Sequence, residues 1–170
     1  MRLRWPLIFL LALTAALLAQ AARHYPKMPE HMASHFDASG AADGWMSKRA
    51  FFEFLAGLTA FLLLMFVGLA KFLPKVPDAW INLPRKSYWL AGERREGTLR
   101  FVSDWLLWQG CWMLAFTAVV HEWVYQANSS GSYHLDGRIW VAIAAFVIWT
   151  LSWIGLLLAK FLRVPGTRSA

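Results

Sequence analysis

Five histidines are the residues of this 170-residue sequence best suited to binding a metal ion. His31 and His35 are four residues apart, and Pro29 and Glu30 just before them favour the first turn of a short helix. On such a helix both imidazoles would lie on one side, as a site for a divalent metal requires. Two other histidines lie at the ends of neighbouring apolar runs and would supply further ligands. The candidate metal ligands are His31, His35, His24 and His121.

A second group of residues shapes a candidate binding surface in the same polar stretch, residues 23–49. Glycines there permit turns that other residues resist, and aspartates can hydrogen-bond the local backbone. We expect this stretch to fold as a cap on the ends of the neighbouring helices, with His35 and Phe36 facing inward. The candidate ligand- or partner-binding residues are His35, Phe36, Gly40, Asp43, Trp45 and Lys48.

Catalytic chemistry has little support in the sequence. The chain contains no glycine-rich phosphate loop, no GxSxG motif and no HExxH motif. Its acidic residues are better placed for scaffolding than for acid–base catalysis. We expect Glu122 to pair with Arg138 across a short turn. We also expect Arg49 to pair with Glu53 at helical spacing. The sequence therefore predicts a protein that is not an enzyme and holds no cofactor, with a divalent metal as the one alternative.

The composition indicates a membrane protein. Hydrophobic residues make up 58% of the chain and charged residues 16%, against about 45–50% and about 25% in soluble domains. A chain of this length could not bury so much apolar surface, so lipid must cover part of it. The net charge of +7 would favour nucleic acid in a soluble domain, but here the basic residues lie beside apolar runs. The single cysteine, Cys111, lies inside such a run, and we expect a small core or lipid-facing residue there.

Four apolar runs are long enough to cross a bilayer as helices, which takes about 17–25 residues. The first ends in Ala19-Gln20-Ala21 and has features of a cleavable signal peptide, but its length favours a retained span. Trp105, Trp108 and Trp112 lie at helical spacing in the third run, which indicates packing or lipid contact. The expected spans are residues 5–22, 51–72, 101–125 and 139–160, joined by an outer loop 23–49, an inner loop 73–100 and an outer turn 126–138.

Positive charge orients these spans. With the N-terminus inside, twelve Lys and Arg residues, Arg2 and Arg168 among them, fall in inner segments and five in outer segments. Because Lys and Arg are enriched in cytoplasmic loops, we expect both termini in the cytoplasm. The predicted fold class is an all-α membrane protein. It is a single domain of four transmembrane helices with a folded extracytoplasmic loop between helices 1 and 2.

The outer loop carries an ordered set of residues: Met28-Pro29, His35-Phe36, Gly40, Asp43, Trp45 and Lys48. This order resembles a domain of unknown function found at the N-terminus of SdpI-type bacterial immunity and signalling membrane proteins. The chain departs from that pattern at Ala33, where the family has a second proline, and in having four expected spans instead of six. The resemblance implies a retained first span, a multi-pass bacterial membrane protein and no known catalytic residues.

The leading hypothesis is a non-enzymatic, multi-pass protein of the bacterial inner membrane whose outer loop binds or senses a ligand or a partner. A membrane protein or a peptide would be such a partner, the lipid bilayer is expected as well, and nucleic acid is not. Two alternatives stay open. One is a metal-binding membrane protein that uses the outer-face histidines, and the other is a structural subunit of a larger membrane complex.

Overall fold

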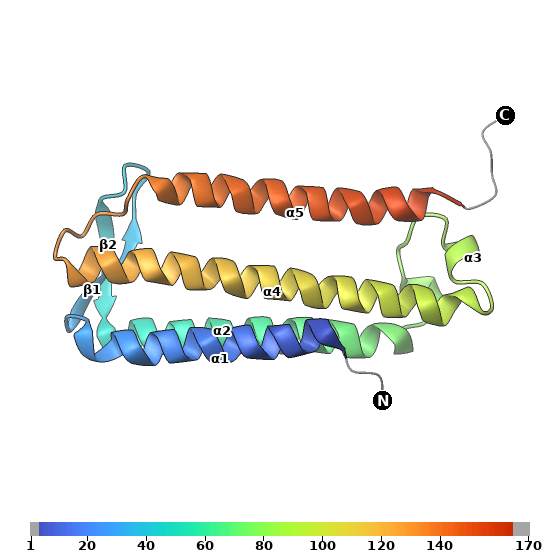
Figure 1. Cartoon of the computed structure of the whole chain (residues 1–170), viewed down its shortest axis with the longest axis horizontal. Coiled ribbons are helices and arrows are strands. Elements are labelled where there is room, and N and C mark those ends of the chain that lie inside the picture. The colour runs from blue at the N-terminus through green and yellow to red at the C-terminus, as the bar shows by residue number, and fades with distance from the viewer. Residues whose placement is uncertain (1–3, 165–170) are drawn as a thin grey trace.

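Four long helices lie side by side in the computed structural model, which describes residues 4–164 (Figure 1). Arg2 and Arg168, counted above in the charge balance, lie outside the described residues. The long helices are α1 (Trp5–His24), α2 (Lys48–Phe72), α4 (Arg94–Ser129) and α5 (Arg138–Leu162). A two-stranded antiparallel sheet of β1 (His31–Phe36) and β2 (Ala42–Ser47) lies at one end of the bundle. The short elements are η1 (Tyr25–Lys27), η2 (Leu73–Lys75), η3 (Asp78–Trp80) and α3 (Lys86–Trp89).

Three of the helical segments are long and apolar enough to cross a membrane: Trp5–Lys27, Lys48–Lys75 and Arg138–Leu162. These segments contain the first, second and fourth spans expected from the sequence. The chain is mostly helical, as expected, and these three helices are suited to a lipid bilayer. The expected third span lies within α4, which has 36 residues and is long enough but is less apolar than these three segments. The fourth transmembrane span therefore stays a prediction.

The main core lies where α1, α2 and α4 meet. Leu10 and Leu17 of α1 pack with Leu62 of α2 and with Leu107 and Leu114 of α4. Such a leucine core is what apolar residues at helical spacing produce when three helices share one interface. Cys111 belongs to this core, as expected, and its thiol lies 3.5 Å from the carbonyl oxygen of Pro6.

Helix α5 is joined to α4 mainly through aromatic rings. Trp153 stacks on Trp105 with ring centroids 3.9 Å apart, and Phe146 stacks on Phe116 at 4.2 Å. In α5, which the structure describes in full, the buried residues are Ile139 and Phe161 near its two ends. Between them lie exposed apolar side chains such as Val141, Ile148 and Leu151, which is the pattern of a helix with one side toward lipid.

The tryptophan stripe of α4 serves two neighbours. Trp105 and Trp112 contact Trp153 and Trp149 of α5, whereas Trp108 lies 5.4 Å from Phe9 of α1 between ring centroids. The interpretation of this stripe as a packing surface is confirmed for these contacts.

Gly110 of α4 leaves room for the Phe66 ring of α2. A Cβ atom built at Gly110 would lie 2.8 Å from Cγ of Phe66, whereas one at Gly68 would meet no atom within 4 Å. We therefore expect Gly110→Ala to lower the thermal unfolding midpoint of the detergent-purified protein, because overpacking costs about 1–3 kcal/mol. Gly68→Ala is the matched control and should leave the midpoint unchanged or raise it, since alanine stabilises a helix by up to about 1 kcal/mol over glycine. Equal shifts for the two variants in an intrinsic-fluorescence melt would contradict this packing.

Candidate functional site

The polar stretch between α1 and α2 forms a β-hairpin. The short helix expected after Pro29 is wrong, because residues 31–36 form β1 and pair with β2. His31 lies opposite Ser47 and Ala33 opposite Trp45, and two shifts in register follow within β1. Hence His31 and His35, which are four residues apart, lie on a strand and not on a helix. The strand buries Met32 and Ala33 completely, so contacts with the rest of the fold override the local helix signal.

The turn of the hairpin is built on Asp37. Its carboxylate accepts hydrogen bonds from the Ser39 amide at 2.8 Å, the Ser39 hydroxyl at 2.6 Å and the Ala41 amide at 3.0 Å. The Ser39 hydroxyl is the largest cause that lowers the pKa of Asp37, and the backbone hydrogen bonds add to it. Gly40 completes the turn with φ of +93°, a left-handed conformation that glycine adopts without strain.

The side chain of Asn128, in the last turn of α4, anchors β1 to the helix. Its carbonyl oxygen accepts a hydrogen bond from the Ala33 amide at 2.8 Å, and its amide nitrogen donates to the Ala33 carbonyl at 2.9 Å. The same nitrogen donates to the carbonyl of Val124. Asn128 is 2% exposed, so these bonds satisfy buried backbone groups that would otherwise be costly. The outer turn expected from residue 126 therefore begins later, because α4 continues to Ser129.

The connection from α4 to α5 lies along the other side of the hairpin. The Ala42 amide donates to the carbonyl of Tyr133, and the Leu135 amide donates to the carbonyl of Gly40. A Cβ atom on Gly40 would lie 2.8 Å from the Leu135 carbonyl oxygen, so the turn and this connection touch directly. The hairpin and residues 133–135 thus form one folded unit, which we call the cap.

The exposed side of the cap carries an imidazole–carboxylate pair. His35 Nδ1 lies 2.5 Å from Oδ1 of Asp43, and these side chains are 75% and 48% exposed. The expectation that His35 faces inward is wrong; Phe36 beside it is half-buried. Gly44 makes the pair possible, because a Cβ there would lie 2.7 Å from Cβ of His35.

A row of aromatic rings lies on the same hairpin. The His31 ring is parallel to that of Trp45, with centroids 5.8 Å apart, and Tyr133 meets Trp45 edge-on at 4.8 Å. Trp45 remains 44% exposed. The sequence analysis did not identify Tyr133 as a binding residue. Its position in the outer turn 126–138 was the only indication that it could lie near the outer loop.

Two of the expected binding residues have structural roles instead. Lys48 is only 12% exposed at its side chain, where it pairs with Glu30 at 2.5 Å and lies over the Tyr25 ring. Gly40 is packed against the α4–α5 connection, as described above. The exposed part of the cap carries two groups: the His35–Asp43 pair, and the rings of His31, Trp45 and Tyr133.

The other two candidate metal ligands lie in a polar cluster beneath the cap. His24 Nδ1 is 3.3 Å from Nε2 of His121, His24 Nε2 is 3.5 Å from Glu122, and the His24 ring stacks on Tyr125. Gln20 donates to Glu122 at 2.8 Å and so fixes that carboxylate. Since the two nitrogens of His24 face different partners, these side chains do not converge on one point. Within residues 4–164, no three His, Cys, Asp or Glu side chains form a group that could hold a metal ion.

The two expected ion pairs have different outcomes. The pairing of Glu122 with Arg138 is wrong, because Arg138 binds Asp136 at 2.8 Å and Glu122 binds Gln20. Arg138 is also the largest cause that lowers the pKa of Asp136 to about 2. The pairing of Arg49 with Glu53 is confirmed, with a distance of 2.7 Å.

Comparison with known families matches one segment of the chain, which contains the hairpin. Residues 7–58 match the family model described as a domain of unknown function, DUF1648. The matched segment extends from α1 through the hairpin into the first half of α2. No curated protein and no solved structure matches the chain. The family has no described activity, so function must be argued from the cap itself.

The anchoring of β1 can be tested by removing the Asn128 side-chain amide. Asn128→Leu leaves the Ala33 amide and carbonyl without that partner, at about 1–3 kcal/mol for each buried group. We expect amide hydrogen exchange across residues 32–45 to accelerate by at least about tenfold. Ser129→Ala, at the exposed next position, should leave exchange unchanged. Exchange in Asn128→Leu as slow as in the unaltered protein would show that the cap is held by other contacts.

The Asp37 turn predicts acid sensitivity of the cap. Because the folded-state pKa of Asp37 lies below the ordinary value of 3.8, its stabilisation is present above that pH and is lost as the pH falls through the folded value. We expect hydrogen exchange at residues 39–41, corrected for intrinsic rates, to accelerate between pH 5 and pH 3. Asp37→Asn should already show the faster exchange at pH 5 and change less on acidification. An equal pH dependence in both proteins would refute this role of Asp37.

Proposed function

We propose that this chain is a non-enzymatic, multi-pass protein of the bacterial inner membrane whose outer cap binds or senses a partner protein or peptide. In this proposal α1, α2, α4 and α5 all span the bilayer and both termini lie in the cytoplasm. The hairpin then projects from the outer ends of the helices. SdpI-like immunity or signalling proteins are the analogy for such a role.

The length of α4 supports a spanning role. Its 36 residues correspond to about 54 Å at 1.5 Å per residue, against about 30 Å for the hydrocarbon core. A spanning α4 would therefore extend beyond the core, so that Asn128 at one end and Arg95 at the other need not enter hydrocarbon. The positive charge of the segments around α3 favours the cytoplasm for that end.

The observation that carries the proposal is the exposed face of the cap. It combines Trp45 and Tyr133 with the paired side chains of His35 and Asp43 on a backbone that α4 and the α4–α5 connection fix in place. Aromatic residues beside charged groups are the usual anchors of protein interfaces. A backbone that is already ordered also lowers the entropic cost of binding. A polypeptide partner fits this face better than a metal ion, since the described histidines do not converge.

Site-specific photocrosslinking in cells tests the proposal. A photoreactive amino acid in place of Trp45 should yield one reproducible protein or peptide adduct. The matched control places the same photoreactive amino acid at Trp80, which is 81% exposed in the loop at the opposite end of the bundle. This control should yield no such adduct. Addition of Asp43→Asn, which removes the carboxylate paired with His35, should lower the adduct yield by about tenfold, as expected for loss of a charge-assisted contact.

Two outcomes would count against the proposal. Equal adducts from positions 45 and 80 would indicate non-specific contact with abundant membrane proteins. A position-45 adduct that Asp43→Asn leaves unchanged would show that the His35–Asp43 pair does not take part.

A further inference from the structure

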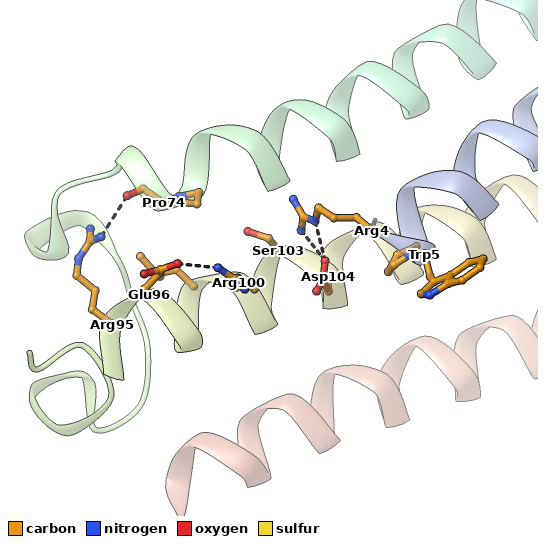
Figure 2. A pocket seen from close by; sticks show the side chains of 10 residues that line it. Arg4, Trp5, Pro74, Arg95, Glu96, Arg100, Ser103 and Asp104 are labelled. Atoms are coloured by element: carbon orange, nitrogen blue, oxygen red, sulfur yellow. Dashed lines mark hydrogen bonds and ion pairs between the residues drawn. The ribbon is translucent and has the colours of Figure 1, made fainter. Parts of the chain in front are cut away.

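An open groove lies at the end of the bundle opposite the cap. It is formed by the start of α1, the end of α2 and the first turns of α4, with a volume of about 1120 Å³ (Figure 2). Trp5 begins the first apolar segment and Pro74 lies at the end of the second, so the groove is at the depth where membrane-spanning helices meet lipid headgroups. The polar residues that line it are Arg4, Arg95, Glu96, Arg100, Ser103 and Asp104.

One lining group has an unused hydrogen-bonding capacity. Ser103 is 1% exposed, and its hydroxyl has no hydrogen-bond partner in the part of the chain that the structure describes. Burial of a hydroxyl without a partner costs about 1–3 kcal/mol, so a ligand that enters the groove and accepts this hydrogen bond would be favoured. Figure 2 shows Ser103 on α4 between Arg100 and Asp104, with Arg4 reaching Asp104 from the start of α1.

Two guanidinium groups beside Ser103 are paired with carboxylates, one exposed and one half-buried. Arg100 binds Glu96 at 2.6 Å and Arg4 binds Asp104 at 2.6 Å. The side chains of the first pair are 56% and 83% exposed, and exposed ion pairs contribute only about 0–1 kcal/mol. The Arg100 guanidinium can therefore turn to a stronger ligand. Arg4 binds Asp104 through Nε and Nη2, so its Nη1 can bind the same ligand while that pair stays in place. Arg95, in contrast, is fixed by Asp78 and by two carbonyl oxygens of the preceding loop.

The chemistry of this arrangement fits a phosphate group. The planar fork of arginine matches two phosphate oxygens, and a serine hydroxyl can donate to a third. A lone carboxylate ligand would offer fewer acceptor oxygens to the same three donors.

An apolar cavity continues the groove between the helices. It has a volume of about 310 Å³, shares Arg4 and Pro74 with the groove, and is lined by Leu7, Val67, Ala70 and Leu107, with Lys71 at its edge. A free phosphate ion would leave this cavity empty. A lipid would place an acyl chain in it while the headgroup remains in the groove.

We propose that the groove binds the phosphate of a membrane phospholipid through Arg100, Arg4 and Ser103, with one acyl chain in the adjoining apolar cavity. The site is separate from the cap, so this proposal stands or falls independently of the proposed function.

The test is native mass spectrometry of the full chain in detergent with added phosphatidylglycerol. Arg100→Gln should lower the fraction with bound lipid by about tenfold, as expected for loss of a charge-assisted hydrogen bond. Glu96→Gln should maintain or raise it, because that change frees the Arg100 guanidinium. Ser103→Ala should lower it. The matched control is Arg49→Gln, which breaks a pair of the same spacing on α2 at the cap end and should have no effect.

The outcomes separate the sources of phosphate. Equal binding of diacylglycerol, which lacks phosphate, would overturn the proposal and indicate apolar contact alone. Inorganic phosphate that binds at the same site with no preference for the lipid would overturn the acyl-chain part and indicate a free phosphate ion. If Arg100→Gln and Glu96→Gln lower the fraction with bound lipid equally, the Arg100–Glu96 ion pair and not the free guanidinium supports binding. That result would overturn the proposal as well.

Discussion

The packing of α1 against α4 is the contact on which the rest of the structure depends. In lipid, apolar contacts between helices replace equally apolar contacts with acyl chains, so polar groups and close packing must specify the register. Here Arg4 binds Asp104 at one end of the pair, and Gln20 binds Glu122 at the other. Buried leucines fill the interval between them. With both ends fixed, α1 cannot slide along α4, and the chain leaves α1 directly beside the end of α4 that holds the hairpin.

The cap depends on α4 for its stability. An isolated two-stranded hairpin is at best marginally stable in water, and this one gains its order from Asn128 and from the connection at residues 133–135. Both lie outside residues 7–58, the segment that matches the family model. Thus the matched segment supplies the strands and the exposed His35–Asp43 pair, whereas their orientation is set by a part of the chain that the match does not include.

Hydropathy predicted much of the helical architecture, because long apolar runs have few other stable structures in lipid. Local pairs such as Arg49 and Glu53 were equally predictable, since helical spacing alone brings them together. The hairpin was not, because its burial of Met32 depends on contacts with distant segments. The error at Glu122 has a similar origin. The long helix α4 turns Glu122 toward Gln20, a partner about one hundred positions away that no local pattern could identify.

Helix α5, which has only two buried residues, is joined to the cap through the connection that precedes it. Helix α5 lacks a leucine core with α1 and α2 and is held to α4 by stacked rings such as Trp105 and Trp153. Its N-terminal connection, however, contains Tyr133, whose carbonyl pairs with β2 and whose ring contacts Trp45. A partner on the exposed face of the cap would therefore contact the segment that positions α5. At its other end α5 is fixed, since Trp89 Nε1 donates to the Phe161 carbonyl at 3.0 Å and Phe161 is 1% exposed. Such a partner would therefore act on the cap end of α5 and not on the whole helix.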